Sequence, residues 1–273
     1  MTTPKIFFHI GLGKVASTYL QNRVFPALEN IYYLPRDRFR RHPKIVASGK
    51  YPSILLSRES GLYLYEKLDD FKKIYPDAYI LLFFRRQDEW IASHYRRYVK
   101  NGGLLCFEEY LDLENDSGIW KQQNLIYMDA IEKTRNLFGE RLLVLTYDRL
   151  KKDQQDFVQR IADFTGATFD YQNISLKPVH SSHSEKKLKA ARKISKLLGL
   201  TDPESSAAHR PFHRLRRRLE LLRSHLILMV GSLLPERWAE TDTLTSTEQK
   251  DKIRSFYASD WQDLVEYEQQ QFK

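Results

Sequence analysis

Residues 5–18 read KIFFHIGLGKVAST, and this stretch decides the fold. Its first six residues form a mostly apolar run rich in aromatic and β-branched side chains, as in a buried strand. A glycine turn follows at Gly11 and Gly13, and a helical pattern begins at Ser17. Because a glycine turn between a strand and a helix exposes successive backbone N–H groups, the stretch predicts a site for phosphate or sulfate.

Three more apolar runs in the first 170 residues predict strands, at Ser53–Leu56, Tyr79–Phe84 and Arg141–Thr146. We expect a polar turn after the last of them and then a helix over Gln154–Thr165. Strands that alternate with helices are typical of βαβ units, so the predicted fold class is α/β, with a parallel β-sheet flanked by helices. Ligands of such sheets bind beyond the carboxyl ends of the strands.

The β signal stops after Phe169, and the rest of the chain reads as a helical C-terminal annex. The expected helices are Ser184–Leu198, His213–Val230 and Thr245–Gln271, with a loop over residues 201–212. The last helix has one apolar face, formed by Phe256, Tyr257, Trp261, Leu264 and Val265. We expect a single domain over residues 1–273, with an α/β core at residues 1–170 and a basic, mainly helical part at residues 171–273.

The composition is that of an ordinary globular protein, with 273 residues, 42% of them hydrophobic and 29% charged. Such values exclude collagen-like and low-complexity chains. The single cysteine, Cys106, excludes an intramolecular disulfide and a zinc site with two or more cysteines, and it is compatible with a reducing compartment. The longest apolar run, Leu226–Leu234, is too short to span a bilayer, so we expect a cytoplasmic protein.

The formal net charge of +9 is concentrated in residues 177–225, where thirteen Lys and Arg face four acidic residues. An excess of this kind suggests an anionic partner. Residues 213–230 form a basic amphipathic pattern, for which three roles remain open: peripheral contact with the inner face of a membrane, binding of an acidic acceptor, or packing on the domain or on a second copy in a homodimer.

The loop after the first strand has an unusual spacing of its polar residues. Lys14 supplies a mobile cation, and Ser17 and Thr18 supply hydroxyl donors at the start of the helix. In nucleotide-hydrolysing loops the residue after Lys is the Ser or Thr that holds magnesium, but here it is Val15. The dinucleotide-binding pattern G-x-G-x-x-G is also absent, because position 16 is Ala. The alternative is a turn that only packs a helix on the sheet, with Lys14 in solvent.

A second polar motif begins at the end of the strand Tyr79–Phe84. Arg85 follows that strand directly, and Ser93 lies eight residues later, about two turns into a helix expected to begin near Gln87. An arginine fork and a hydroxyl suit a phosphate monoester.

Together these motifs resemble the PAPS-dependent sulfotransferase family, of the carbohydrate or bacterial type. There a K-T-G-T-[ST] loop binds the 5'-phosphosulfate, and R-N-P-x-x-R-x-x-S binds the 3'-phosphate. This chain offers Lys14–Thr18 for the first and Arg85–Ser93 for the second, and LTYDRLKKD at residues 145–153 is similar to the family's strand and acidic turn. The resemblance implies a P-loop-like fold, PAPS as co-substrate, PAP as product and no metal. It also implies a nucleotide-binding role for the core, at Gly11, Gly13, Lys14, Val15, Ala16, Ser17, Thr18, Arg85 and Ser93.

The chain departs from the family pattern at three positions. Ala16 replaces a glycine, which narrows the backbone freedom of the first loop. Gln87 and Trp90 stand where Pro and Arg are common in the second motif, so Arg85 is expected to carry more of the 3'-phosphate recognition. Trp90 is expected in the core or a lid.

The resemblance implies in-line sulfuryl transfer to a hydroxyl or amine of an acceptor, a glycan, lipid or small metabolite. Such transfer needs a base and cations that stabilise the leaving phosphate, the role assigned to Lys14. Glu59 is the preferred base, because it follows a strand near the phosphate loop. His9 remains an alternative base, and His94 is expected to be structural.

Two other functions remain open from the sequence. One is a P-loop kinase acting on a nucleotide or small molecule, which the missing hydroxyl after Lys14 disfavours. The other is a non-enzymatic basic module that binds an acidic polymer. Nucleic acid is not expected as a partner, because residues 177–225 contain a single aromatic residue, Phe212, and nucleic-acid modules usually interleave aromatic and basic residues.

Overall fold

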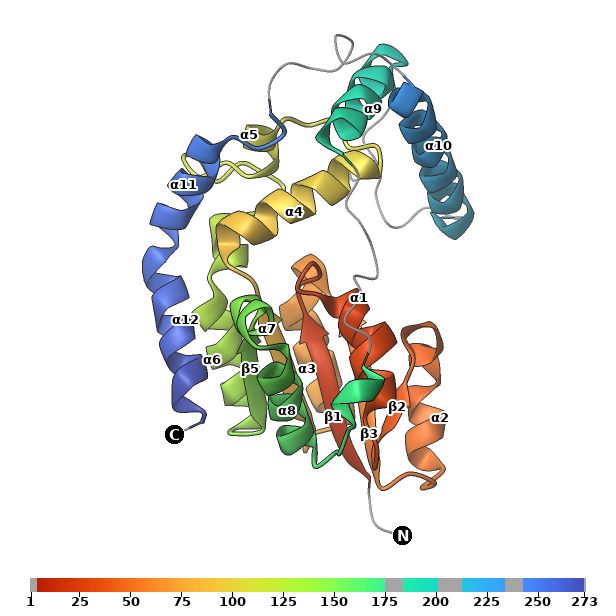
Figure 1. Cartoon of the computed structure of the whole chain (residues 1–273), viewed down its shortest axis with the longest axis vertical. Helices are drawn as coiled ribbons and strands as arrows, with labels where there is room; N and C mark the ends of the chain where they lie inside the picture. The colour runs from red at the N-terminus through yellow and green to blue at the C-terminus, as the bar shows by residue number, and fades with distance from the viewer. Residues whose placement is uncertain (1–3, 175–183, 201–212, 234–242, 273) are drawn as a thin grey trace. The chain divides into compact units, whose positions relative to one another are not determined.

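The computed structural model describes residues 4–174, 184–200, 213–233 and 243–272 (Figure 1). The chain divides into two compact units. The first unit consists of Met1–Arg86, Ile126–Val179 and Tyr257–Lys273, and the second consists of Gln87–Leu125 and His180–Phe256. The single domain with parts at residues 1–170 and 171–273 stays a prediction.

The first unit is built on a parallel sheet of five strands in the order β2-β3-β1-β4-β5. The strands are β1 (Lys5–Gly11), β2 (Tyr32–Leu34), β3 (Ser53–Glu59), β4 (Tyr79–Phe84) and β5 (Leu142–Thr146). The predicted α/β class with a parallel sheet is therefore confirmed. Two details were wrong: β3 continues to Glu59, and β2 was missed because three residues are too few to show an alternating pattern.

Helices cover both faces of this sheet (Figure 1). The helices of this unit are α1 (Ser17–Tyr19), which continues as a π-helix over Leu20–Val24, α2 (His42–Ala47), α3 (Leu64–Ile74), α6 (Tyr127–Phe138), α7 (Tyr147–Lys152), α8 (Gln154–Thr165) and α12 (Ala258–Gln270). Consecutive residues of β4 point to opposite faces. The Phe84 ring contacts Tyr127 of α6, and the Phe83 ring contacts Phe157 of α8, so α6 and α8 cover opposite faces.

Two sequence expectations about helices were wrong. The polar turn expected after β5 is the helix α7, which begins at once because Thr146 caps it: the backbone N–H of Arg149 donates to the Thr146 hydroxyl. The single helix expected over Thr245–Gln271 is two helices, α11 (Thr247–Phe256) and α12, which meet at Tyr257. Of its expected apolar face, Tyr257 and Leu264 are buried, whereas Phe256 is exposed.

The second unit is helical. It contains α4 (Gln87–Lys100), α5 (Phe107–Tyr110), α9 (Glu185–Leu197), α10 (His213–Leu233) and α11. The helices α9, α10 and α11 pack on α4. Trp90 of α4 is fully buried, so it is a core residue. The loop expected over residues 201–212 lies outside the described residues.

Candidate active site

The loop between β1 and α1 has a constrained backbone. Lys14 has a φ of 67° and Ala16 a φ of 63°, so two non-glycine residues within three positions adopt the left-handed conformation. For a residue with a Cβ this conformation costs roughly 1 kcal/mol or more, and such strain gathers at functional sites. Ala16 is the N-cap residue of α1, and its backbone makes the turn from strand to helix. The loop shape is therefore imposed by its surroundings rather than by the preferences of its residues.

Ser17 is a buried polar residue at the start of α1. It is 2% exposed, and among the described residues its hydroxyl has no hydrogen-bond partner. Leaving a buried hydroxyl unsatisfied costs about 1–3 kcal/mol, so such groups in folded proteins usually have an external partner. The Ser60 hydroxyl, which follows β3, is also buried without a partner in the described part of the chain. Both hydroxyls belong to segments at the carboxyl ends of neighbouring strands.

Glu59 lies beside the phosphate loop. It is the last residue of β3 and is paired in register with Gly11 of β1, and the next backbone N–H, of Ser60, donates to the Gly11 carbonyl oxygen at 2.9 Å. A Cβ added at Gly13 would lie 3.1 Å from both Cδ and Oε2 of Glu59. The close approach explains why position 13 is glycine: a side chain there would displace the carboxylate. Arg36 Nη1 lies 3.9 Å from Glu59 Oε2.

Arg85 is held from two directions within the first unit. Its carbonyl oxygen accepts a hydrogen bond of 2.9 Å from the Tyr127 hydroxyl, and its guanidinium carbon lies 4.8 Å from the centre of the Tyr147 ring. Ser93 is half-buried on α4 and belongs to the second unit. Because the two residues fall in different units, the joint action of Arg85 and Ser93 stays a prediction.

His9, the alternative base, and His94, expected to be structural, are each hydrogen-bonded to a neighbouring hydroxyl. His9 is 2% exposed, and its Nδ1 shares a hydrogen bond of 2.7 Å with the hydroxyl of Ser57, which also accepts a bond from the Gln21 amide. Burial lowers the pKa of His9 from 6.5 to about 3, so the ring is neutral. His94, in the second unit, shares a hydrogen bond of 2.5 Å with the hydroxyl of Tyr110. Of the candidate bases, Glu59 alone is placed against the phosphate loop.

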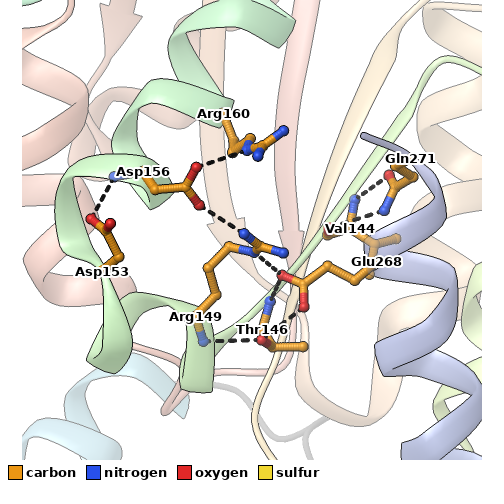
Figure 2. Close-up of polar contacts among 8 residues, drawn as sticks. All are labelled: Val144, Thr146, Arg149, Asp153, Asp156, Arg160, Glu268 and Gln271. Atoms are coloured by element: carbon orange, nitrogen blue, oxygen red, sulfur yellow. Dashed lines mark hydrogen bonds and ion pairs between the residues drawn. The ribbon is translucent and has the colours of Figure 1, made fainter. Parts of the chain in front are cut away.

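The helix α12 binds the end of β5 through a network that sequence reasoning missed (Figure 2). Glu268 accepts hydrogen bonds from the backbone N–H and hydroxyl of Thr146 and from Nε of Arg149, at 2.8–3.0 Å. Arg149 also donates to Asp156 at 2.7 Å. Directly after α12, the side-chain amide of Gln271 pairs with the backbone of Val144, so it satisfies part of the sheet edge. The available signal was Glu268 itself, a carboxylate four residues after Leu264 on the apolar face.

A second contact of α12 involves Tyr127, the residue that binds the Arg85 carbonyl oxygen. Asp260, in its first turn, accepts hydrogen bonds from the backbone N–H groups of Tyr127 and Met128, at 2.9 and 3.0 Å. Its carboxylate thereby caps the N-terminus of α6. The contact fixes Tyr127, whose hydroxyl holds the Arg85 carbonyl oxygen.

Within the described ranges, no group of three or more His, Cys, Asp or Glu side chains is arranged to hold a metal ion. None of the helices described is both long and apolar enough to cross a membrane.

Comparison with known proteins finds similarity to sulfotransferases. A family model described as "Sulfotransferase family" matches residues 52–171, a segment that contains Glu59, Arg85 and Ser93 but begins after the phosphate loop. The crystal structure of a sulfotransferase from Alicyclobacillus acidocaldarius is similar, with a TM-score of 0.52 and 16% identity over 74% of this chain and 98% of that one. That likeness supports the fold.

The mouse sulfotransferase SULT7A1, solved in complex with PAP, aligns over 98% of this chain and 89% of its own, with 14% identity and a TM-score of 0.48, too low to support an argument. No curated protein matches the sequence. The predicted α/β fold is confirmed, and residues 52–171 are similar to sulfotransferases, in agreement with the resemblance found in the sequence. The match to the sulfotransferase model is confined to residues 52–171, which is fewer than half of the chain.

Proposed function

We propose that the chain transfers the sulfuryl group of PAPS to a hydroxyl or amine of an acceptor, a glycan, lipid or small metabolite. The observation that carries the proposal is the unsatisfied, buried hydroxyl of Ser17 in a strained loop that also holds Lys14. A bound phosphosulfate would supply the missing acceptor for this hydroxyl. Its charge would be met by Lys14 and by the backbone N–H groups from Gly13 to Thr18.

Bound PAPS supplies the sulfuryl group and a phosphate as leaving group. The residues of the chain then have separate tasks. Lys14 and the loop N–H groups stabilise negative charge that grows on the leaving phosphate oxygen, and they are already oriented before the reaction. Glu59, next to Gly13, takes the proton of the attacking hydroxyl or amine. Gly13 keeps the space in which that carboxylate lies.

Recognition of the 3'-phosphate is assigned to Arg85 and Ser93. An arginine offers two parallel N–H donors to a phosphate. Contacts with Tyr127 and Tyr147 restrict Arg85 before any ligand binds. Preorganisation of this kind reduces the entropy lost on binding.

Thermal unfolding with nucleotides tests the proposal. We expect adenosine 3',5'-bisphosphate, without magnesium, to raise the melting temperature, because a ligand that binds the folded state stabilises it. ATP with magnesium should leave it unchanged. Labelled PAPS with a panel of hydroxylated glycans, lipids and amines then identifies the acceptor class. Stabilisation by ATP with magnesium and not by the bisphosphate would instead support the P-loop kinase.

A further inference from the structure

The helix α10 presents a stripe of exposed apolar side chains. Leu219, Leu222, Leu226, Met229 and Val230 are each between 49% and 62% exposed. Their spacing of three, four, three and one residues places them along one side of an α-helix, which turns once every 3.6 residues. The structure therefore leaves this apolar stripe largely exposed to solvent.

The opposite side of α10 supplies its packing within the second unit. Ile227 and Leu228 are buried, and the Ser224 hydroxyl donates to the carbonyl oxygen of Asn101 at 3.0 Å. Gly231 fits closely against α9, since a Cβ there would lie 3.3 Å from that of Ala190. The exposed stripe therefore lies on a helix whose opposite side packs within the second unit.

The charge of α10 restricts what can cover the stripe. The segment His213–Leu233 contains five arginines and a single acidic residue, Glu220. A second copy would bring two helices of the same positive charge together, which opposes association. A sulfated or carboxylated polysaccharide would suit the arginines but offers no apolar surface for the leucines. A lipid surface with anionic headgroups and apolar chains beneath them suits both the positive charge and the apolar stripe of α10.

We propose that α10 is a docking helix for an anionic lipid surface, with the stripe inserted at the level of the headgroups and the positive charge of the segment attracting the anionic lipid. The helix would lie in the plane of the interface. This proposal concerns location and stands independently of the acceptor and of the reaction.

Vesicle flotation of the full chain tests the proposal. We expect binding to vesicles of phosphatidylcholine mixed with phosphatidylglycerol, no binding to vesicles of phosphatidylcholine alone, and weaker binding as salt rises. The double variant Leu222→Ser, Leu226→Ser should reduce the partition coefficient by about tenfold or more, because two apolar side chains no longer enter the lipid. Neutralising three arginines, with Arg216→Gln, Arg217→Gln and Arg218→Gln, should remove most of the preference for anionic lipid.

Matched controls come from exposed residues of the first unit. Ile74→Ser removes an exposed apolar side chain, and Lys44→Gln, Lys50→Gln and Lys73→Gln remove three positive charges on exposed residues. Both controls should float as the wild type does. A labelled variant provides a second readout that does not depend on loss of binding: with Cys106→Ser and Leu226→Cys, an environment-sensitive dye at position 226 should shift to the blue only with anionic vesicles.

Three results would overturn the proposal. One is the absence of binding to either kind of vesicle. Another is binding that Leu222→Ser, Leu226→Ser leaves intact, which would make the attraction purely electrostatic. The third is a concentration-dependent dimer in light scattering that the same double variant abolishes while the wild type ignores vesicles, which would identify a second copy as the occupant.

Discussion

The phosphate loop and the α12 network differ in whether a buried polar side chain has a hydrogen-bond partner within the chain. In the α12 network, Glu268 is 3% exposed and accepts three hydrogen bonds from Thr146 and Arg149. In the loop, Ser17 is equally buried, but its hydroxyl has no partner in the part of the chain that the structure describes. The comparison teaches that buried polar groups satisfied internally stabilise a scaffold, whereas those left unsatisfied are available to a ligand.

The largest expected effect comes from removing the loop cation. We expect Lys14→Ala to lower kcat/KM for sulfuryl transfer by about 10³-fold, because a preoriented positive charge is lost where the leaving phosphate develops charge. The melting temperature without ligand should hardly change, because a half-buried side chain in a loop contributes little packing. The matched control is Lys73→Ala on the exposed side of α3, which should keep full turnover. Normal turnover in the Lys14 variant would refute the role of the loop.

The next expected effect is a loss of kcat without a loss of nucleotide binding. Glu59→Gln should lower kcat by roughly 10²–10⁴-fold, since the amide cannot accept the acceptor proton, while the KM for PAPS stays within about twofold. The control is Glu66→Gln, an exposed carboxylate on α3. Steady-state kinetics with the identified acceptor measures both constants. Equal losses in nucleotide affinity and kcat would mean that Glu59 shapes the loop instead of acting as the base.

A substitution in the α12 network should lower the stability of the protein. Glu268→Ala leaves the Thr146 N–H and the Arg149 guanidinium without their buried acceptor, so we expect the free energy of unfolding to fall by about 2–3 kcal/mol. Urea unfolding measures it. Glu266→Ala, an exposed carboxylate on the same helix, should stay close to the wild type. If the two variants were equally stable, the network would contribute nothing to the scaffold.

A small effect tests the strain in the loop. Ala16 has a φ of 63°, so Ala16→Gly should raise the free energy of unfolding by up to about 1 kcal/mol, since glycine adopts this conformation at less cost. The affinity for adenosine 3',5'-bisphosphate should be kept. Gly139→Ala provides the converse control: its φ of 64° makes an added Cβ unfavourable, and the variant should be less stable. A less stable Ala16→Gly variant would show that the loop backbone is not strained.

The sequence predicted those parts of the fold that local pattern encodes. The start of β1, all of β4 and the helix Gln154–Thr165 were correct, because long apolar runs and regular periodicity determine them. The helix α7 was missed because its sequence, YDRLKK, is short and polar, and Glu268, which stabilises its start, lies more than a hundred residues further along the chain. The break at Tyr257 was missed because neither Gly nor Pro marks it.

The candidate site was predictable to a similar extent. The glycine turn between strand and helix pointed to Lys14 and Ser17, and the resemblance together with a strand-end position pointed to Glu59; their roles stay predictions. The structure brings Glu59 against the loop through the register of β1 and β3. Supporting residues such as Tyr127 and Asp260 could not be found, because they act across contacts between segments far apart in the sequence. Periodicity identifies a buried face, but it does not identify the polar partner on the other side.

Two buried hydroxyls, Ser17 and Thr146, provide the most direct test of the central claim. Each is removed in a variant, Ser17→Ala and Thr146→Val, and the free energy of unfolding and the affinity for adenosine 3',5'-bisphosphate are measured for both. Thr146→Val should lose about 1–2 kcal/mol of stability, because a helix cap and a bond to Glu268 disappear. Ser17→Ala should lose no stability but about tenfold in affinity. A Ser17 variant that is destabilised like the Thr146 variant and binds the nucleotide normally would contradict the account.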